Sequence, residues 1–180
     1  NRIKLSGSIG KQQDNITGRK AYTSVRTISS ANLGLQPTKN YNVNVSFSNY
    51  GTAQEQGLRV VNDTFRVAQN NLSLSLSQNY TIINKLRSMN FTMNVSYQEL
   101  QDLNPFGTYA TGENQVWFLN MNANHIRLRD NFGLMGGVNV SHNSFYTGSY
   151  FLVGPTLGAS KPFMSNKLRT SLNVSYNKGF

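Results

Sequence analysis

Residues 88–98, SMNFTMNVSYQ, decide the fold of this chain. Every second residue is apolar, and the positions between carry Asn, Thr, Ser or Gln: the apolar set is Met89, Phe91, Met93, Val95 and Tyr97. Successive side chains of a β-strand point to opposite faces of the sheet. The segment therefore predicts a strand with one apolar face and one polar, uncharged face.

The same alternation recurs along the chain. Residues 40–50, NYNVNVSFSNY, alternate Asn or Ser with Tyr, Val and Phe, and residues 71–78, NLSLSLSQ, alternate Leu with Ser. Helical spacing of apolar residues is nowhere sustained. We predict an all-β, antiparallel, up-and-down structure with strands at about 2–10, 20–35, 40–49, 65–79, 88–99, 115–126, 132–142, 150–160 and 167–176. Pro155 falls inside the eighth of these, where it predicts a bulge or an edge.

The composition fits strands whose polar face carries no charge. Hydrophobic residues make up 38% of the 180 residues and charged residues only 13%, while the 25 Asn, 19 Ser and 13 Thr fill much of the remainder. Ten Phe and nine Tyr argue against a disordered chain. The absence of Cys excludes disulfides and cysteine-based chemistry. No apolar run reaches the ~18–20 residues of a membrane-spanning helix. We expect one domain, residues 1–180, and a processed or internal stretch, since no initiator Met or signal peptide opens the sequence.

The predicted connections alternate in length and in charge. Short ones are expected near 36–39, 80–87, 127–131 and 161–166, and mostly longer ones near 11–19, 50–64, 100–114 and 143–149. Basic residues gather at the short connections: Lys39, Lys85, Arg87, Arg127, Arg129, Lys161, Lys167 and Arg169. Six of the seven acidic residues lie in or beside the long ones: Asp14, Glu55, Asp63, Glu99, Asp102 and Glu113. Strand interiors nearly free of charge are typical of an outer-membrane β-barrel, because a Lys or Arg at the bilayer midplane costs about 2–4 kcal/mol.

Aromatic residues near both ends of the predicted strands suggest two girdles at the lipid interfaces. The residues that we expect there are Tyr41, Phe47, Tyr97, Trp117, Phe132, Tyr150 and Tyr176. The alternative is that aromatic residues simply favour strands. Nine strands would leave an unpaired edge in lipid, so we expect the chain to form part of a larger barrel.

Two runs carry a resemblance to a known family. Residues 46–80, SFSNYGTAQEQGLRVVNDTFRVAQNNLSLSLSQNY, and residues 148–177, with the strand Gly-Pro-Thr-Leu-Gly at 154–158, resemble elements of outer-membrane barrel proteins from Bacteroidota. The resemblance implies a transmembrane β-barrel that is normally longer than this chain, and no functional residue is carried over. The TonB-dependent transporters of these bacteria are similar in style. Their plug domain and energy-coupling box are not in this sequence, which argues against active transport.

Two histidines limit the catalytic chemistry that the chain can offer. His142 is predicted to face outward with Ser144 two residues on, a pair similar to that of outer-membrane phospholipase A and lipid A deacylase, in which a His base activates a Ser nucleophile. A third group would have to orient the imidazole. The preceding strand offers Asn120, Asn122 and Asn124, whose faces the sequence leaves open. An acyl-ester hydrolase therefore stays an alternative.

The remaining signals favour neither a cofactor nor nucleic acid. No His, Asp or Glu cluster has the spacing of metal ligands, and no Gly-rich phosphate loop is present. The net charge of +10 would suit nucleic acid. However, the cations occupy turns at one end instead of a face with stacking aromatics. We expect this basic rim to contact anionic lipid headgroups or an acidic partner.

The sequence thus predicts a non-enzymatic, porin-like β-barrel in the outer membrane of a Gram-negative bacterium. Its short turns would be periplasmic and its long loops extracellular. It would act as a passive pore or as an integral subunit of a larger outer-membrane assembly. The expected partners are the lipid bilayer, including lipopolysaccharide, and other outer-membrane subunits. A soluble β-sandwich adhesin is the further alternative, and it predicts extraction without detergent.

Overall fold

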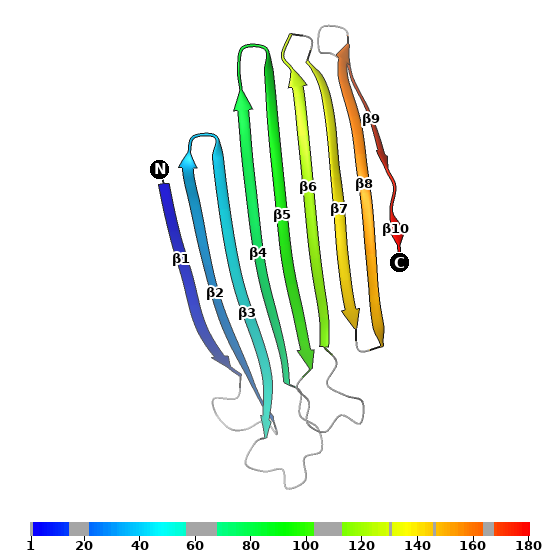
Figure 1. Cartoon of the computed structure of the whole chain (residues 1–180). Helices are drawn as coiled ribbons and strands as arrows, with labels where there is room; N and C mark the ends of the chain where they lie inside the picture. Colours follow the sequence, from blue (N-terminus) through cyan, green and yellow to red (C-terminus); the bar gives the residue numbers. More distant parts are fainter. Residues whose placement is uncertain are drawn as a thin grey trace.

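The computed structural model describes residues 2–14, 22–56, 68–102, 113–129, 131–145, 147–163 and 168–180. Its strands are β1 (Arg2–Gln13), β2 (Tyr22–Thr38), β3 (Tyr41–Gln56), β4 (Ala68–Ile83), β5 (Arg87–Asp102), β6 (Glu113–Arg127), β7 (Phe132–Phe145), β8 (Gly148–Phe163), β9 (Leu168–Ser175) and β10 (Lys178–Gly179). The predicted all-β, antiparallel, up-and-down fold is confirmed, because strands β1 to β9 pair in sequence order within one sheet (Figure 1). Within these residues, no helix has the length and apolar character needed to cross a membrane.

Strands β9 and β10 form a single interrupted strand along β8. Both pair with β8 in one continuous register. The break faces Pro155, whose carbonyl accepts a hydrogen bond from the backbone N–H of Tyr176 (3.1 Å) and whose nitrogen has no hydrogen to donate in return. Pro155 therefore marks a missing hydrogen bond in the ladder, not the bulge or edge expected from the sequence. With β9 and β10 taken as one strand, nine strands lie side by side among the described residues.

Most strands extend further than the side-chain alternation predicts. β3 continues to Gln56 and β5 to Asp102. Ladder hydrogen bonds join backbone groups, so pairing persists where the alternation of side chains fades. Residues 80–83, expected in a connection, form the end of β4. The connection expected near 143–149 is reduced to residues 146–147, since Phe145 pairs with Gly148.

The connections differ between the two ends of the sheet. At one end, which we call the hairpin end, they comprise residues 39–40, 84–86, 128–131 and 164–167. At the other, which we call the loop end, they comprise residues 14–21, 57–67, 103–112 and 146–147. The predicted contrast in length therefore holds for every hairpin except β7–β8.

Local chemistry closes two of the short turns. The side-chain Oδ1 of Asn84 accepts hydrogen bonds from the backbone N–H groups of Leu86 (3.0 Å) and Arg87 (2.8 Å). Asn131, just before β7, has a positive φ of 52°, a conformation that Asn tolerates better than most residues. These residues set where β5 and β7 begin.

Successive hairpins are staggered in one direction. Direct pairing across the intervening strands connects Tyr41, the first residue of β3, with Val174, six residues into β9. The stagger thus averages about one residue per strand, with no offset between the starts of β5 and β7, and stagger of this kind accompanies the tilt of strands in a barrel. Figure 1 shows the hairpin end climbing from β2 to β9. The sheet itself is open, because β1 and β9 each pair on one side only.

The sheet is a single layer without a core. Val25 is the one buried hydrophobic side chain among the described residues. A β-sandwich buries its apolar side chains between two packed sheets. The described strands form one sheet and leave their apolar side chains uncovered.

Candidate functional site

The register sorts the side chains of the sheet into two faces. Directly paired residues of neighbouring strands project to the same face. We call the apolar face the one that carries Val95 of β5, and the polar face the one that carries Ser96. The pairing assigns every described strand residue to one of them.

The apolar face carries an aliphatic band across the middle of the sheet. Between β3 and β8 its members are Val43, Val45, Leu76, Met93, Val95, Leu119, Met121, Val138, Val140, Val153 and Leu157. Gln78 is the one hydrogen-bonding side chain in this part of the described sheet, and it accepts from the Tyr41 hydroxyl (3.1 Å). No described charged side chain lies within the band from β3 to β8.

An aromatic row flanks the band toward the loop end. Directly paired positions place Phe47, Leu74, Tyr97, Trp117, His142 and Phe151 in one line across six strands. The ring centroids of Tyr97 and Trp117 are 4.4 Å apart, and those of His142 and Phe151 are 6.3 Å apart. The row is therefore rich in rings, interrupted by Leu74 on β4, and has an amphipathic character suited to an interface.

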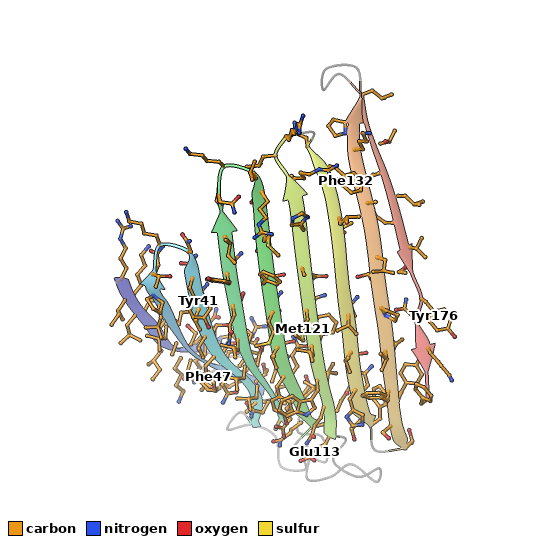
Figure 2. All side chains as sticks on the ribbon, turned by 45° about the horizontal axis from the view of Figure 1, so that its top comes forward. Tyr41, Phe47, Glu113, Met121, Phe132 and Tyr176 are labelled. Atoms are coloured by element: carbon orange, nitrogen blue, oxygen red, sulfur yellow. The ribbon has the colours of Figure 1, made fainter. Side chains whose placement is uncertain are left out.

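A second aromatic group flanks the band toward the hairpin end. Tyr41 and Tyr80 meet edge to face with centroids 6.1 Å apart, and Phe91 follows on β5. The Arg127 guanidinium lies 5.8 Å from the centroid of the Phe132 ring. Figure 2 shows Tyr41 and Phe132 on the hairpin side of Met121 and Phe47 on its loop side.

Two of the seven aromatic residues expected at the interfaces lie elsewhere. Tyr150 is on the polar face, where it pairs with Asn143, because Phe151 takes the apolar position beside it. Tyr176 is on the apolar side but opposite Pro155, in the row of Met121, and so lies away from the strand ends. The other five are on the apolar face, flanking the band: Tyr41, Phe47, Tyr97, Trp117 and Phe132.

The polar face is built mainly from Asn, Ser and Thr in cross-strand rows, with Phe118, Met135 and Leu152 among them. Ser8 and Ser30 share a hydrogen bond of 2.8 Å, and Ser46 bonds Ser75 in the same way. One row places Asn44, Ser77, Asn94, Asn120 and Asn139 side by side, with a hydrogen bond from Asn120 to Asn139. Asn122 and Asn124 lie on this face as well. Its described charged side chains lie toward the ends of their strands: Arg2, Lys4, Arg26 and Asp102.

The predicted basic residues lie at the hairpin end as far as the structure describes them. Lys39, Lys85 and Arg129 are in the turns. Arg87 and Arg127 are directly paired on the apolar face, and Lys161 stands on the same face of β8. Lys167 lies outside the described residues, and Arg169 is described only as a backbone partner of Pro162.

Acidic side chains lie at the loop end. The Tyr97 hydroxyl donates to Glu99 (2.7 Å), and the Gln101 amide donates to both Glu99 and Glu113, the latter at 3.3 Å. Asp14 accepts from the backbone N–H of Ser24 (2.7 Å). Asp63 and the Glu55 side chain lie outside the described part. Figure 2 shows Glu113 at the loop end of the sheet, so described acidic side chains gather at this end, where Lys11 and Arg26 also lie.

His142 and Ser144 share the apolar face near the loop end. The imidazole stands between its paired neighbours Trp117 and Phe151. Asn120, Asn122 and Asn124 are on the opposite face and therefore cannot orient it. In the described part of the chain, neither His142 nor Ser144 makes a side-chain hydrogen bond. The same part holds no group of three or more His, Cys, Asp or Glu suited to a metal ion.

Sequence reasoning missed a hollow on the apolar face. Ala123 and Gly136 are directly paired, so two small residues lie side by side within the band. Two adjoining open hollows of about 550 Å³ and 310 Å³ share these residues and Phe91 as lining. From the alternation alone, both positions are ordinary members of the apolar band. Only the register between β6 and β7 shows that they are neighbours.

Comparison with known proteins adds no family. No protein-family model matches the sequence, and no curated protein matches it either. Function must therefore be inferred from the two faces and the two ends of the sheet.

Proposed function

We propose that this chain forms the wall of an outer-membrane β-barrel that acts as a passive pore, or as an integral subunit of a larger outer-membrane assembly. The observation that carries the proposal is the bare apolar face of a one-layer sheet. Large side chains such as Trp117, Met121 and Leu157 are 48%, 44% and 69% exposed, and they belong to one continuous surface. A contiguous apolar surface of this extent needs a membrane or a partner to cover it.

The order of chemistry along each strand supports lipid as the cover. From β3 to β8, the aliphatic band has aromatic rings on both sides, and the described charges lie outside it. This is the sequence of environments met on crossing a bilayer, from headgroup to hydrocarbon to headgroup. Lys178 of β10 is a charged side chain at the level of the band, where it pairs with Val153 and lies 4.7 Å from the centroid of the Phe180 ring. The strands have 14 to 17 residues in β2 to β8, and about 9–11 tilted residues suffice to cross the hydrocarbon.

The polar face supports a hydrated interior. Asn, Ser and Thr can bond one another or water without a net charge, and the described mid-strand positions carry no Lys, Arg, Asp or Glu. A sheet in lipid must pair every backbone group, so it has to close. The stagger of the strands, about one residue per strand on average, is of the kind that a closed barrel has. We infer periplasmic turns at the hairpin end and extracellular loops at the loop end.

Gel mobility of the native polypeptide tests the barrel. We expect an outer-membrane fraction to retain the protein after alkaline extraction, and the unboiled protein to migrate faster than the boiled one. Recovery in the soluble fraction with no mobility shift would refute the membrane proposal. Recordings across planar bilayers then separate the two roles: steady open channels indicate a pore, and a membrane-integrated but silent protein indicates a closed subunit.

A further inference from the structure

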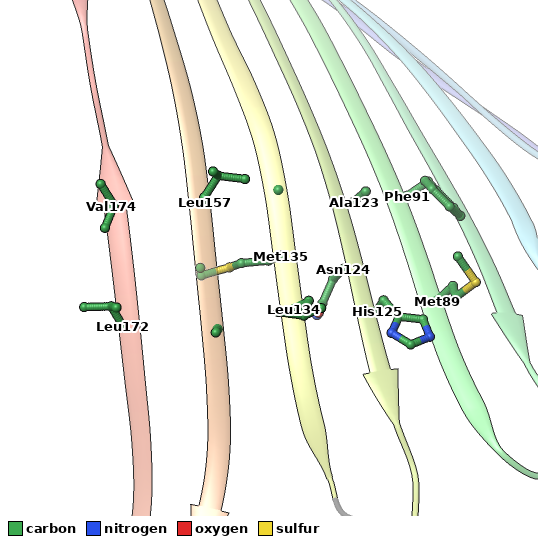
Figure 3. A pocket seen from close by; sticks show the side chains of 13 residues that line it. Met89, Phe91, Ala123, Asn124, His125, Leu134, Met135, Leu157, Leu172 and Val174 are labelled. Atoms are coloured by element: carbon green, nitrogen blue, oxygen red, sulfur yellow. The ribbon is translucent and has the colours of Figure 1, made fainter.

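The hollow on the apolar face has walls and a floor of defined chemistry. Ala123 and Gly136 form the floor. Phe91 stands on one side and Leu157 on the other, with Val174 beyond it on β9 (Figure 3). Leu157 is 69% exposed and Phe91 39% exposed, so both walls stand open to whatever covers the sheet. The hollow is thus an uncovered apolar groove and not a cavity inside the protein.

The groove divides into two parts. The larger hollow, of about 550 Å³, extends from Phe91 toward Leu172 and Val174. The smaller, of about 310 Å³, extends from Phe91 toward Tyr41 and Tyr80. Two adjoining apolar slots of this size suit two flexible hydrocarbon chains held side by side.

A cationic row adjoins the groove on the same face. His125 lines the larger hollow at its hairpin side (Figure 3). Arg87 and Arg127 come two residues closer to the hairpin end, which is about 7 Å along a strand. Lys161 stands on the same face of β8. Long basic side chains can lay their stems along apolar surface and place their charges at its edge.

We propose that the groove and this row together bind one anionic diacyl phospholipid. Its acyl chains would occupy the two hollows, and its phosphate would lie against Arg87, Arg127 and Lys161. The inference rests on the proposed membrane location and adds the class of lipid that the wall selects. Charge complementarity identifies the occupant, because an apolar two-part groove ending at three cations matches two chains joined to one phosphate.

Native mass spectrometry of the full chain, with phosphatidylglycerol and phosphatidylcholine supplied in equal amounts, tests the site. We expect one phosphatidylglycerol to be retained in preference to phosphatidylcholine. The double variant Arg87→Gln/Arg127→Gln should lower this preference about fivefold per charge removed. Lys4→Gln, which removes a cation from the polar face of β1, should leave it unchanged.

Filling the groove provides a test that does not involve charge. A Cβ at Gly136 would meet only Leu157 Cδ2, at 3.5 Å, so Gly136→Leu can fold while occupying the hollow. We expect this variant to lose the bound lipid. Ala31→Leu, a small residue on the same face beside Phe47, is the matched control and should retain it.

The outcomes separate this inference from the membrane proposal. If the protein is extracted by alkali and shows no mobility shift, both fail. If it is membrane-integrated but binds the two lipids equally, or if Gly136→Leu retains phosphatidylglycerol as the unmodified chain does, the lipid site alone is overturned.

Discussion

At the scale of single residues, adjacent positions on one strand meet opposite surroundings. Val95 lies in the middle of the apolar band, and Ser96 lies on the polar face. We expect Val95→Lys to destabilise the protein in lipid vesicles by about 2–4 kcal/mol, because it places a charge in hydrocarbon. Ser96→Lys should change stability by far less, since its side chain meets water. Denaturant unfolding of both variants in vesicles measures the difference, and equal losses would contradict the assignment of faces.

Gly136 and Gly137 make a second neighbouring pair. A Cβ at Gly137 would approach the backbone carbonyl oxygen of Met121 to 2.7 Å and collide with the Asn122 side chain. Gly137→Ala should therefore cost about 1–3 kcal/mol of folding free energy. Gly136→Ala meets only ordinary contact, so it should be neutral or stabilise the fold by up to about 1 kcal/mol. Thermal or denaturant unfolding measures the stability of both variants. If Gly136→Ala loses as much folding free energy as Gly137→Ala, the described packing of the two glycines is wrong.

The sequence predicts the face of a residue only where the alternation is unbroken. Met89 to Tyr97 alternate without fault, and the register places them as predicted. Tyr150 and Phe151 are adjacent aromatic residues, so either could take the apolar side. Because Phe151 pairs with His142, Phe151 lies on the apolar face and Tyr150 on the polar face. This pairing depends on the register between β7 and β8, so the sequence of β8 alone does not predict it.

At the scale of elements, one proline determines where the last strand is interrupted. Pro155 lacks the N–H that would bond the Tyr176 carbonyl. Pro155→Ala should restore this bond and make β9 and β10 continuous. We expect the new amide at residue 155 to exchange its hydrogen more slowly than an amide that makes no hydrogen bond. The Tyr176 amide should exchange more slowly in the variant than in the unmodified chain. Global stability should change little, because the new bond is offset by the greater freedom of the unfolded chain.

The existence of the strands is predictable from sequence, whereas their ends are not. Residues 143–149 contain Asn, Ser and Gly, which are typical of loops. The structure nonetheless pairs Phe145 with Gly148, because backbone hydrogen bonds from β7 and β8 meet there regardless of side-chain type. The groove at Ala123 and Gly136 escaped prediction for a related reason, since it depends on the register between β6 and β7.

At the scale of the whole molecule, the two edges of the sheet run in the same direction. β1 and β9 both run from the hairpin end to the loop end (Figure 1). An all-antiparallel barrel has an even number of strands, so the proposed barrel requires an odd number of further strands between these edges. Two copies of this chain side by side cannot supply them, because β9 of one would meet a parallel β1 of the other.

Disulfide scanning tests this requirement in a chain that has no Cys of its own. We expect no intramolecular cross-link between a Cys at Ser6 and one on β9 at Ser171, Asn173 or Ser175. The positive control is Ser46→Cys with Ser75→Cys, whose hydroxyls are already in contact across β3 and β4. Rapid oxidation of any β1–β9 pair would mean that nine strands close on themselves.

The up-and-down order of the hairpins has a consequence for how such a wall can change over evolutionary time. Each hairpin carries the same two faces and returns the chain to the same end of the sheet, so duplication of a hairpin lengthens the wall without altering the direction of either edge. Gain or loss of a single strand would reverse one edge and move its connection to the opposite end. The width of the sheet, and with it the circumference of the proposed barrel, can therefore vary only in steps of two strands, while each added hairpin keeps one apolar and one polar face.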